Sequence, residues 1–268
     1  MKRLVSIILA TALSVCAFSQ NISSPDRKLN LRVDKKTCTY SVKYDGQQVM
    51  AGSVAQLELY DGSFAWEEGA KVKISKKRKV REQIDATFYK QKSFEYVYNS
   101  MVLDFKNGFS MEWRLSDCGL AYRFSTTREG ETVIKNETGK FAFCDDAVLT
   151  SASPFENNSN PYRTSFENTY TDAPLSAEMK KYAFIPVVLT LPSQLRVVVA
   201  ESSVSSYPGA FARSVAGENT LAIEFPPYPE KDFIAVSSGS RNYPWRILKF
   251  STDDRDIPAD NLVYALAE

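Results

Sequence analysis

The chain contains no histidine among its 268 residues. That absence excludes Ser-His-Asp and Cys-His nucleophiles, HExxH zinc sites and mixed Cys/His zinc sites. Neither the G-x-G-x-x-G fingerprint of dinucleotide-binding folds nor the G-x-x-x-x-G-K-[ST] phosphate loop occurs. Among the remaining catalytic devices, pairs of carboxylates are the one to look for in this sequence.

Long apolar runs are scarce as well, and the one example lies at the start of the chain. Lys2 and Arg3 precede the apolar stretch "LVSIILATALSVCAF", and Ala17-Phe18-Ser19 has the small-x-small pattern of a cleavage site. The pattern predicts a signal peptide over residues 1–19, a mature chain over residues 20–268 and a periplasmic or secreted location. No later run reaches the roughly 20 residues of a membrane span, so no transmembrane span is expected.

Cysteine is limited to four residues, and Cys16 lies within the predicted signal peptide. Cys38, Cys118 and Cys144 remain, an odd number for an oxidising compartment. At most one disulfide can form within the chain, and buried free thiols are an equal alternative. Three scattered cysteines cannot build a structural zinc site by themselves.

Charge of either sign is in no marked excess, since 33 Lys and Arg balance 32 Asp and Glu. A formal charge of +1 gives no electrostatic reason to expect nucleic acid or acidic lipid as a partner. The local exception is "KVKISKKRKVR" at residues 71–81, in which apolar residues alternate with basic ones. This alternation favours a strand with one solvated basic face over a binding patch.

What the chain does contain is period-two alternation from end to end. In "TCTYSVKYDG" the apolar residues alternate up to Asp45-Gly46, which is typical of a tight hairpin turn. A second hairpin is expected around Ser116–Gly119, and further strands are expected at residues 94–105, 184–191, 195–201, 219–225 and 245–250. Because no dozen residues carry a clear helical stripe, the predicted class is all-β, with a large sandwich as the architecture.

The stretch at residues 153–176 interrupts this rhythm. It is rich in Asn, Ser, Thr and Pro and carries Phe155, Tyr162, Phe166 and Tyr170. A loop of this length is often functional, and aromatic rings with amides are what a sugar-binding rim uses. The alternative is a surface connection whose aromatic side chains pack back onto the sheet.

Glu201 stands where a strand's apolar pattern calls for another aliphatic residue. Leu195, Val197, Val199 and Glu201 alternate and therefore point to one side of the strand. Either the strand has reached the rim and the carboxylate is hydrated, or the carboxylate faces inward at a sheet edge and is held for a cation or a partner domain. The adjacent acidic pairs, at 67–68, 145–146 and 253–254, are more simply solvated turns.

Several stretches together resemble the N-terminal region of glycoside hydrolase family 97, the bacterial α-glucosidases and α-galactosidases. They are "SSPDRKLNLRV", "TYSVKYDGQQV", "GLAYRF", "AESSVSSYPGAF" and "RNYPWRILKFSTDDRDIPADNLVYALAE". The last is the most specific, because a similar element leads from the family's N-terminal β-super-sandwich into its (β/α)8 barrel. The resemblance implies a large antiparallel β-super-sandwich of the galactose-mutarotase-like kind over residues 20–268.

The resemblance also implies a division of roles. The family's catalytic carboxylates lie in the barrel, so this chain by itself is not expected to hydrolyse glycosides, and its sequence stops where a barrel would begin. Glu201 matches a glutamate that reaches a calcium ion beside the substrate, so calcium is expected only in combination with a barrel domain. The expected partners are an oligosaccharide or α-glycoside and a catalytic barrel chain. A free-standing carbohydrate-binding module using the 153–176 loop is the alternative, and a decayed gene product is a third.

Overall fold

The computed structural model describes residues 19–86, 88–154, 162 and 167–268. Its strands form two antiparallel sheets. In order across the first sheet lie β1 (Ser19–Ser23), β2 (Leu29–Asp34), β3 (Thr39–Tyr44), β4 (Gln47–Leu59), β9 (Glu131–Ala142), β16 (Thr220–Glu224), β15 (Phe211–Ser214) and β12 (Ala183–Phe184), and β17 (Ala235–Ser238) also pairs with β9.

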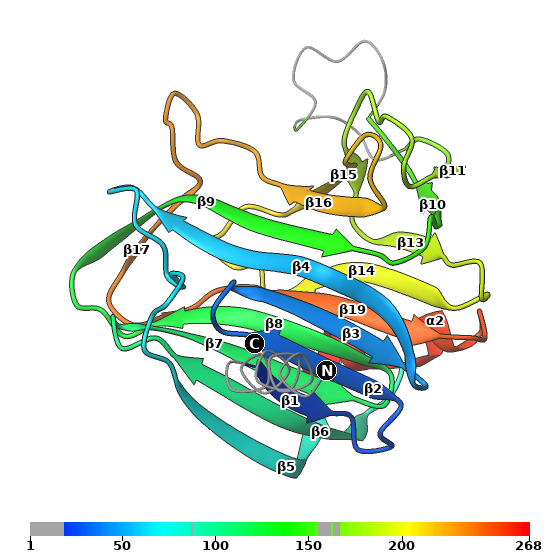
Figure 1. The fold of residues 1–268 in the computed structure, drawn as a ribbon, viewed down its shortest axis with the longest axis horizontal. Helices are drawn as coiled ribbons and strands as arrows, with labels where there is room; N and C mark the ends of the chain where they lie inside the picture. Colours follow the sequence, from blue (N-terminus) through cyan, green and yellow to red (C-terminus); the bar gives the residue numbers. More distant parts are fainter. Residues whose placement is uncertain (1–18, 87, 155–161, 163–166) are drawn as a thin grey trace, which may run out of the picture.

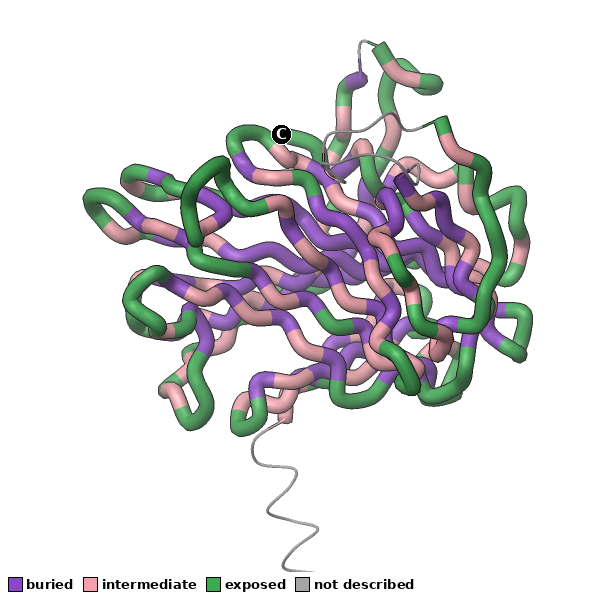
Figure 2. Tube along the Cα trace, turned by 90° about the horizontal axis from the view of Figure 1, so that it is seen from above, coloured by how far each residue is buried: buried purple, intermediate pink, exposed green. Residues whose placement is uncertain are grey.

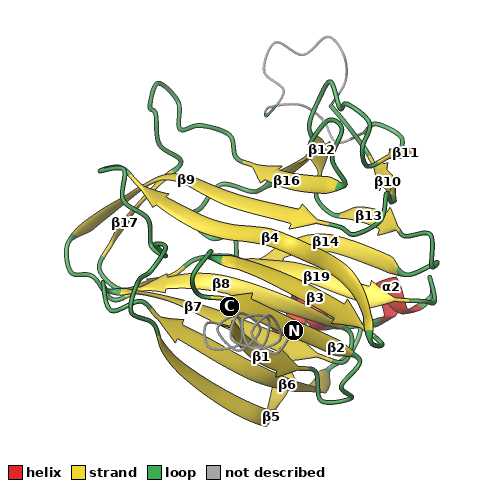
Figure 3. Ribbon diagram, viewed as in Figure 1, coloured by secondary structure: helices red, strands yellow, loops and turns green. Residues whose placement is uncertain are grey.

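The second sheet packs against the first, and Figure 1 shows strands β1–β4 lying over β7, β8 and β19. In order across it lie β11 (Thr171–Pro174), β10 (Val148–Ser151), β13 (Val187–Thr190), β14 (Arg196–Ser202), β19 (Trp245–Ser251), β8 (Gly119–Thr126), β7 (Phe109–Ser116), β6 (Ser93–Asp104) and β5 (Lys73–Asp85), and β18 (Arg241–Asn242) also pairs with β8. Figure 3 shows strands nearly throughout. The predicted all-β sandwich is confirmed.

Both predicted hairpins are present. Asp45 and Gly46 have φ values of 48° and 81° and join β3 to β4. Positive φ at both central positions gives a turn whose twist matches that of the flanking strands. Ser116 pairs with Gly119 where β7 turns into β8.

The main hydrophobic core lies between the two sheets. Alternate residues of the strands point into it, and its largest members include Trp66, Trp113, Tyr40 and Tyr122, each at most 1% exposed. In Figure 2 the buried residues follow the strands and the exposed ones the turns. Since burying apolar area stabilises the fold by about 25 cal/mol per Å², this layer is the main source of its stability.

The basic stretch forms an edge strand. Among the described strands β5 pairs with β6 alone, and most of its residues are exposed, while Ile74 and Val80 are half-buried. Lysine on an edge strand disfavours pairing with another molecule's strand. The prediction of a strand with a solvated basic face is confirmed.

Two short helices, α2 (Asp256–Ala259) and α3 (Leu262–Ala265), cover part of the outer face of the second sheet. Sequence periodicity did not predict them, because one helical turn is too short to show a 3.6-residue pattern. Over the described residues, no helix is long and apolar enough to cross a membrane. The predicted signal peptide lies outside the described residues, apart from Ser19.

The cysteines of the described chain are free thiols. Cys38 is buried, Cys118 is half-buried and Cys144 is exposed. Burial raises the pKa of Cys38 to about 12 and that of Cys118 to about 11. Both remain protonated at neutral pH, which makes them poor nucleophiles and poor metal ligands. Of the two alternatives left open by the sequence, free thiols are what the structure contains.

Candidate functional site

Glu201 lies in β14 and faces the space between the two sheets. It is paired across the ladder with Arg246 of β19, so the two side chains leave the sheet on the same side. Leu195, Val197 and Val199 belong to the main core, as the alternation predicted. The side chain of Glu201 is 15% exposed, which places it at the end of the core and next to solvent.

Arg246 connects both sheets through ion pairs. Its Nε and Nη2 donate to Oε1 and Oε2 of Glu137 on β9, each at 2.7 Å, and its Nη1 donates to Oε2 of Glu201 at 2.5 Å. The hydroxyl of Tyr207 donates to Oε2 of Glu137 at 2.9 Å. These four residues, Arg246, Glu137, Glu201 and Tyr207, are called the Arg246 cluster below. Two-point pairing between a guanidinium and a carboxylate is geometrically demanding, so the cluster fixes the position of both sheets.

The Arg246 cluster carries more negative than positive charge when both carboxyl groups are ionised. Arg246 is 2% exposed and supplies one positive charge against two carboxylates. Burial raises the pKa of Glu201 above its ordinary value, although Arg246 and the backbone NH of Ala210 act in the opposite direction. With one guanidinium against two ionised carboxylates, the cluster has a formal charge of −1, so a cation at the exposed side of Glu201 would be attracted.

The loop after β14 closes over this cluster. The backbone NH of Ala210 donates to both carboxylate oxygens of Glu201 at 3.1 Å, and Ser203 and Ser206 adopt positive φ. This conformation turns the chain back after Glu201 and brings Tyr207 into contact with Glu137. The chain reverses at Val204–Tyr207, where the backbone NH of Tyr207 donates to the carbonyl oxygen of Val204, and not at Pro208 and Gly209, where the sequence would suggest it.

Two hollows flank the loop. One, of about 930 Å³, is lined by Tyr162, Tyr207 and Tyr228 with several prolines of the 226–229 segment. The other, of about 420 Å³, is lined mostly by serines and includes Arg241 and Glu268. Both fall in the range of small-molecule sites.

The aromatic residues of the 153–176 stretch behave differently from one another. Tyr162 stacks on Tyr182 at 4.8 Å and contacts Phe211 edge to face, so it packs back onto the sheet while also lining the larger hollow. Tyr170 is 56% exposed. Phe155 and Phe166 lie outside the described residues.

Glu201 is the residue of the Arg246 cluster that could serve as a calcium ligand. Calcium takes about 6–8 oxygen ligands, and in the described residues no group of three or more His, Cys, Asp or Glu side chains could hold a metal ion. Glu137 is fully engaged by Arg246 and Tyr207. Glu201 retains acceptor capacity and uncompensated charge, so it fits a shared site but not a self-contained one.

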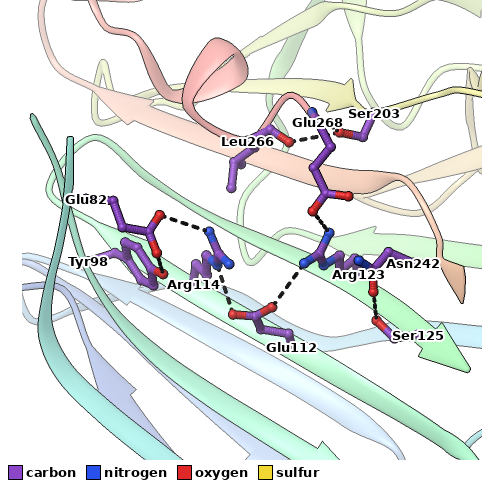
Figure 4. Close-up of polar contacts among 10 residues, drawn as sticks. All are labelled: Glu82, Tyr98, Glu112, Arg114, Arg123, Ser125, Ser203, Asn242, Leu266 and Glu268. Atoms are coloured by element: carbon purple, nitrogen blue, oxygen red, sulfur yellow. Dashed lines mark hydrogen bonds and ion pairs between the residues drawn. The ribbon is translucent and has the colours of Figure 1, made fainter. Parts of the chain in front are cut away.

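A second polar network covers the outer face of the second sheet, next to the end of the chain. Figure 4 shows Glu112 between Arg114 and Arg123, with Glu268 on the far side of Arg123. The guanidinium groups of Arg114 and Arg123 lie over the ring of Trp245, at 4.9 and 4.4 Å from its centroid. The network ties the C-terminal residues to the sheet.

Sequence reasoning identified Glu201 but missed its partners. Arg246 interrupts the apolar face formed by Leu248 and Phe250 just as Glu201 interrupts its own, so the same signal could have found it. Glu137 gave no such signal, because polar residues surround it in sequence. The adjacent acidic pairs lie in turns and mostly face solvent, as expected.

The raised pKa of Glu201 predicts how stability depends on pH. A carboxyl group whose pKa is higher in the folded state favours folding below its unfolded pKa, near 4.3, and this contribution is lost as the pH rises through the folded value. Glu201→Gln removes the titration but keeps an acceptor. We expect the wild-type chain to gain stability relative to Glu201→Gln as the pH falls from neutral towards 4.5, measured by urea unfolding.

Ser203→Ala serves as the control, because it alters the same loop without a titratable group. The prediction would be contradicted if the stability of wild type relative to Glu201→Gln stayed constant with pH or increased as the pH rises.

Comparison with known proteins identifies the family of the chain. The family model described as "Glycosyl-hydrolase 97 N-terminal" matches residues 22–268. A retaining α-galactosidase of Bacteroides thetaiotaomicron is 29% identical over 99% of this chain and 44% of its own length.

Solved structures agree on the fold. A glycoside hydrolase family 97 enzyme from Pseudoalteromonas sp. strain K8, in complex with acarbose, superposes with a TM-score of 0.78 at 16% identity over 93% of this chain and 38% of its own. A β-arabinopyranosidase superposes with a TM-score of 0.74 at 22% identity over 87% of this chain and 40% of its own. The chain therefore spans less than half the length of these relatives.

Proposed function

Because the chain belongs to the glycosyl-hydrolase 97 N-terminal family, we propose that it acts as the non-catalytic sandwich that completes the sugar site of a catalytic barrel. The observation that carries this proposal is the incompletely compensated carboxylate of Glu201 at the exposed end of the Arg246 cluster. A second domain seated there would supply the missing positive charge and oxygen ligands.

In this arrangement the chain's own residues position Glu201 and take no part in bond cleavage. Arg246 and the NH of Ala210 hold the carboxylate in one orientation. Calcium, when bound between Glu201 and oxygen atoms of the second domain, would supply positive charge beside the substrate.

The test is reconstitution with the part of the B. thetaiotaomicron α-galactosidase that this chain does not match. We expect the chain alone to leave nitrophenyl α-galactoside uncleaved, because glycoside hydrolysis needs two carboxyl groups about 5–9.5 Å apart on either side of the bond. Added to the partner fragment, the chain should raise its turnover in a calcium-dependent way. Glu201→Gln should abolish that dependence, while the matched exchange Glu224→Gln, whose carboxylate pairs with Arg213 and not with Arg246, should not.

Turnover by the purified chain alone, or stimulation indifferent to Glu201→Gln, would contradict the proposal. The alternative is a free-standing carbohydrate-binding module. The hollow lined by Tyr162, Tyr207 and the 54% exposed Tyr228 favours this alternative, and a sugar titration of the chain alone tests it. Such a module would bind oligosaccharide without any partner and lose affinity in Tyr228→Ala.

A periplasmic or secreted location belongs to the same proposal, because the start of the chain has the pattern of a signal peptide. The small-x-small pattern at residues 17–19 supports removal of the signal peptide. We expect mass spectrometry of the protein from the producing cell's envelope or medium to give an N-terminus at Gln20. A mature form that begins at an acylated Cys16 would instead place the protein on a membrane through a lipid anchor.

A further inference from the structure

A basic hollow lies where the edges of the two sheets meet. β1 is the edge strand of the first sheet and β5 that of the second, and in Figure 1 both lie at the lower side of the molecule. The hollow has a volume of about 540 Å³ and is called the β1–β5 hollow below. Its lining comprises residues 21–25 and Arg27, from β1 and the turn after it, and Lys76, Arg78, Lys79 and Asn99, from β5 and β6.

The walls of the β1–β5 hollow are held by hydrogen bonds that cross from one sheet to the other. Lys76 Nζ donates to the carbonyl oxygen of Asn21 at 2.7 Å. The side chain of Asn99, which is 8% exposed, donates through Nδ2 to the carbonyl oxygen of Ser23 at 2.6 Å and accepts at Oδ1 from the backbone NH of Lys79 at 2.6 Å. The hollow is therefore a fixed part of the fold and not a gap between loose side chains.

A β-bulge gathers basic residues at this point. The register between β5 and β6 shifts between Lys77 and Val80, so Arg78 and Lys79 lie together opposite Asn99, and Lys79 has a φ of 51°. In a regular strand two successive side chains point to opposite faces, whereas a bulge re-aims them. Arg78 and Lys79 consequently line the same hollow. The period-two pattern that predicted a solvated basic face could not reveal this convergence.

The positive charge of the hollow has no counter-charge in the described chain. Four basic residues line it, and among the described residues no Asp or Glu does. None of the four forms an ion pair there. Asp26, next to Arg27 in sequence, accepts from the Ser24 hydroxyl and does not line the hollow. Burial and then the charge of Arg78 lower the pKa of Lys76, so like charges repel one another at this place and an anion would be attracted.

The kind of side chain selects the kind of anion. A guanidinium group can bond two oxygens of one oxyanion at once, and lysine adds a mobile point charge. One carboxylate brings a single charge and two oxygens, which would leave most of the four cations unmatched. A phosphate monoester brings about 1.5 to 2 negative charges at neutral pH and three acceptor oxygens. The volume lies within the about 300–1,000 Å³ of small-molecule sites.

We propose that the β1–β5 hollow binds a phosphate monoester group, carried by a soluble sugar phosphate or by a lipid head group, with Arg78 and Lys79 as its principal contacts. The site shares no residue with the Arg246 cluster and does not depend on the function proposed for it.

The test compares two double variants of the full chain, Arg78→Gln/Lys79→Gln and Lys71→Gln/Lys73→Gln. Each removes two positive charges from the same basic stretch, but Lys71 and Lys73 are exposed and do not line the hollow. In calorimetric titrations at low salt, glucose 6-phosphate and inorganic phosphate should bind saturably and glucose should not. Arg78→Gln/Lys79→Gln should weaken binding about tenfold or more, while the control should change it by less than about twofold.

The two variants should share the melting temperature of the wild type, because in the described chain the side chains of Arg78 and Lys79 make no hydrogen bond or ion pair. Should the double variant fail to fold, Arg78→Gln alone gives a second variant that should weaken binding too. Vesicles of phosphatidylcholine with and without phosphatidic acid distinguish the two sources. Co-sedimentation that needs phosphatidic acid and is lost in Arg78→Gln/Lys79→Gln assigns the phosphate to a lipid, and binding of glucose 6-phosphate assigns it to a soluble ligand.

Three results would overturn the proposal. No saturable binding of any phosphate probe, soluble or in vesicles, would remove the site. An equal loss of affinity in both double variants would show a general effect of charge and not a site in the hollow. Acetate that binds as tightly as inorganic phosphate would overturn the choice of a phosphate monoester.

Discussion

Replacing Arg246 with methionine is expected to lower the free energy of unfolding by about 3–5 kcal/mol, because removing one partner of a buried ion pair leaves uncompensated charge in the core. Glu137 is 3% exposed and would keep only Tyr207 as a hydrogen-bond donor from the cluster. Urea unfolding measures the loss, which is a large share of the about 5–15 kcal/mol that stabilises a typical protein.

Arg241→Met provides the matched control. Arg241 also lies over the rings of Tyr207 and Tyr243, but it is partly exposed and donates to loop carbonyl oxygens of Ser205 and Ser206. Its replacement should cost less than about 1.5 kcal/mol. Adding Glu137→Gln to Arg246→Met should recover part of the lost stability. A loss below about 1 kcal/mol in Arg246→Met alone would show that the Arg246 cluster is not what joins the sheets.

The second large effect is expected at Trp245. Its side chain is 1% exposed and lies beneath two guanidinium groups, so Trp245→Ala removes a large buried ring and two cation–π contacts. Loss of a buried tryptophan costs about 3–5 kcal/mol, and each cation–π contact adds about 0.5–2 kcal/mol. We expect a loss of at least about 3 kcal/mol by urea unfolding, because truncation of the buried ring alone reaches that value before the cation–π contacts are counted.

Trp245→Phe should lose less than half of the stability that Trp245→Ala loses, because it keeps an aromatic face under Arg114 and Arg123. Tyr170→Ala removes an exposed aromatic side chain and should change stability by no more than about 0.5 kcal/mol. A loss in Trp245→Ala as small as that of Tyr170→Ala would mean that the outer face of the sheet, with its arginine network, contributes little to the fold.

Local sequence pattern was enough to predict most strands and both hairpins. Alternation in β3 and the Asp45-Gly46 turn depend on neighbours in sequence, and so does the solvated basic face of β5. The order of strands across the sheets was not predictable in this way. That β19 lies between β14 and β8 depends on contacts between segments far apart in the chain, which periodicity does not encode.

The candidate site shows the same division. The inward direction of Glu201 follows from the spacing of Val197 and Val199. Its pairing with Arg246 depends on strand register, and its distance from Glu137 depends on how the two sheets face each other.

The central position of β19 in the second sheet has a consequence for the time course of folding. Tyr122 of β8 pairs with Arg246, so β8 keeps one edge without its final partner while on the order of 120 further residues are synthesised. At about 5–20 residues per second, that interval is about 6–24 s on the ribosome. During it the nascent chain presents a strand, buried on both faces in the finished molecule, to whatever strand edge it meets. Interrupting synthesis before Trp245 should therefore yield an aggregating chain rather than a smaller folded domain.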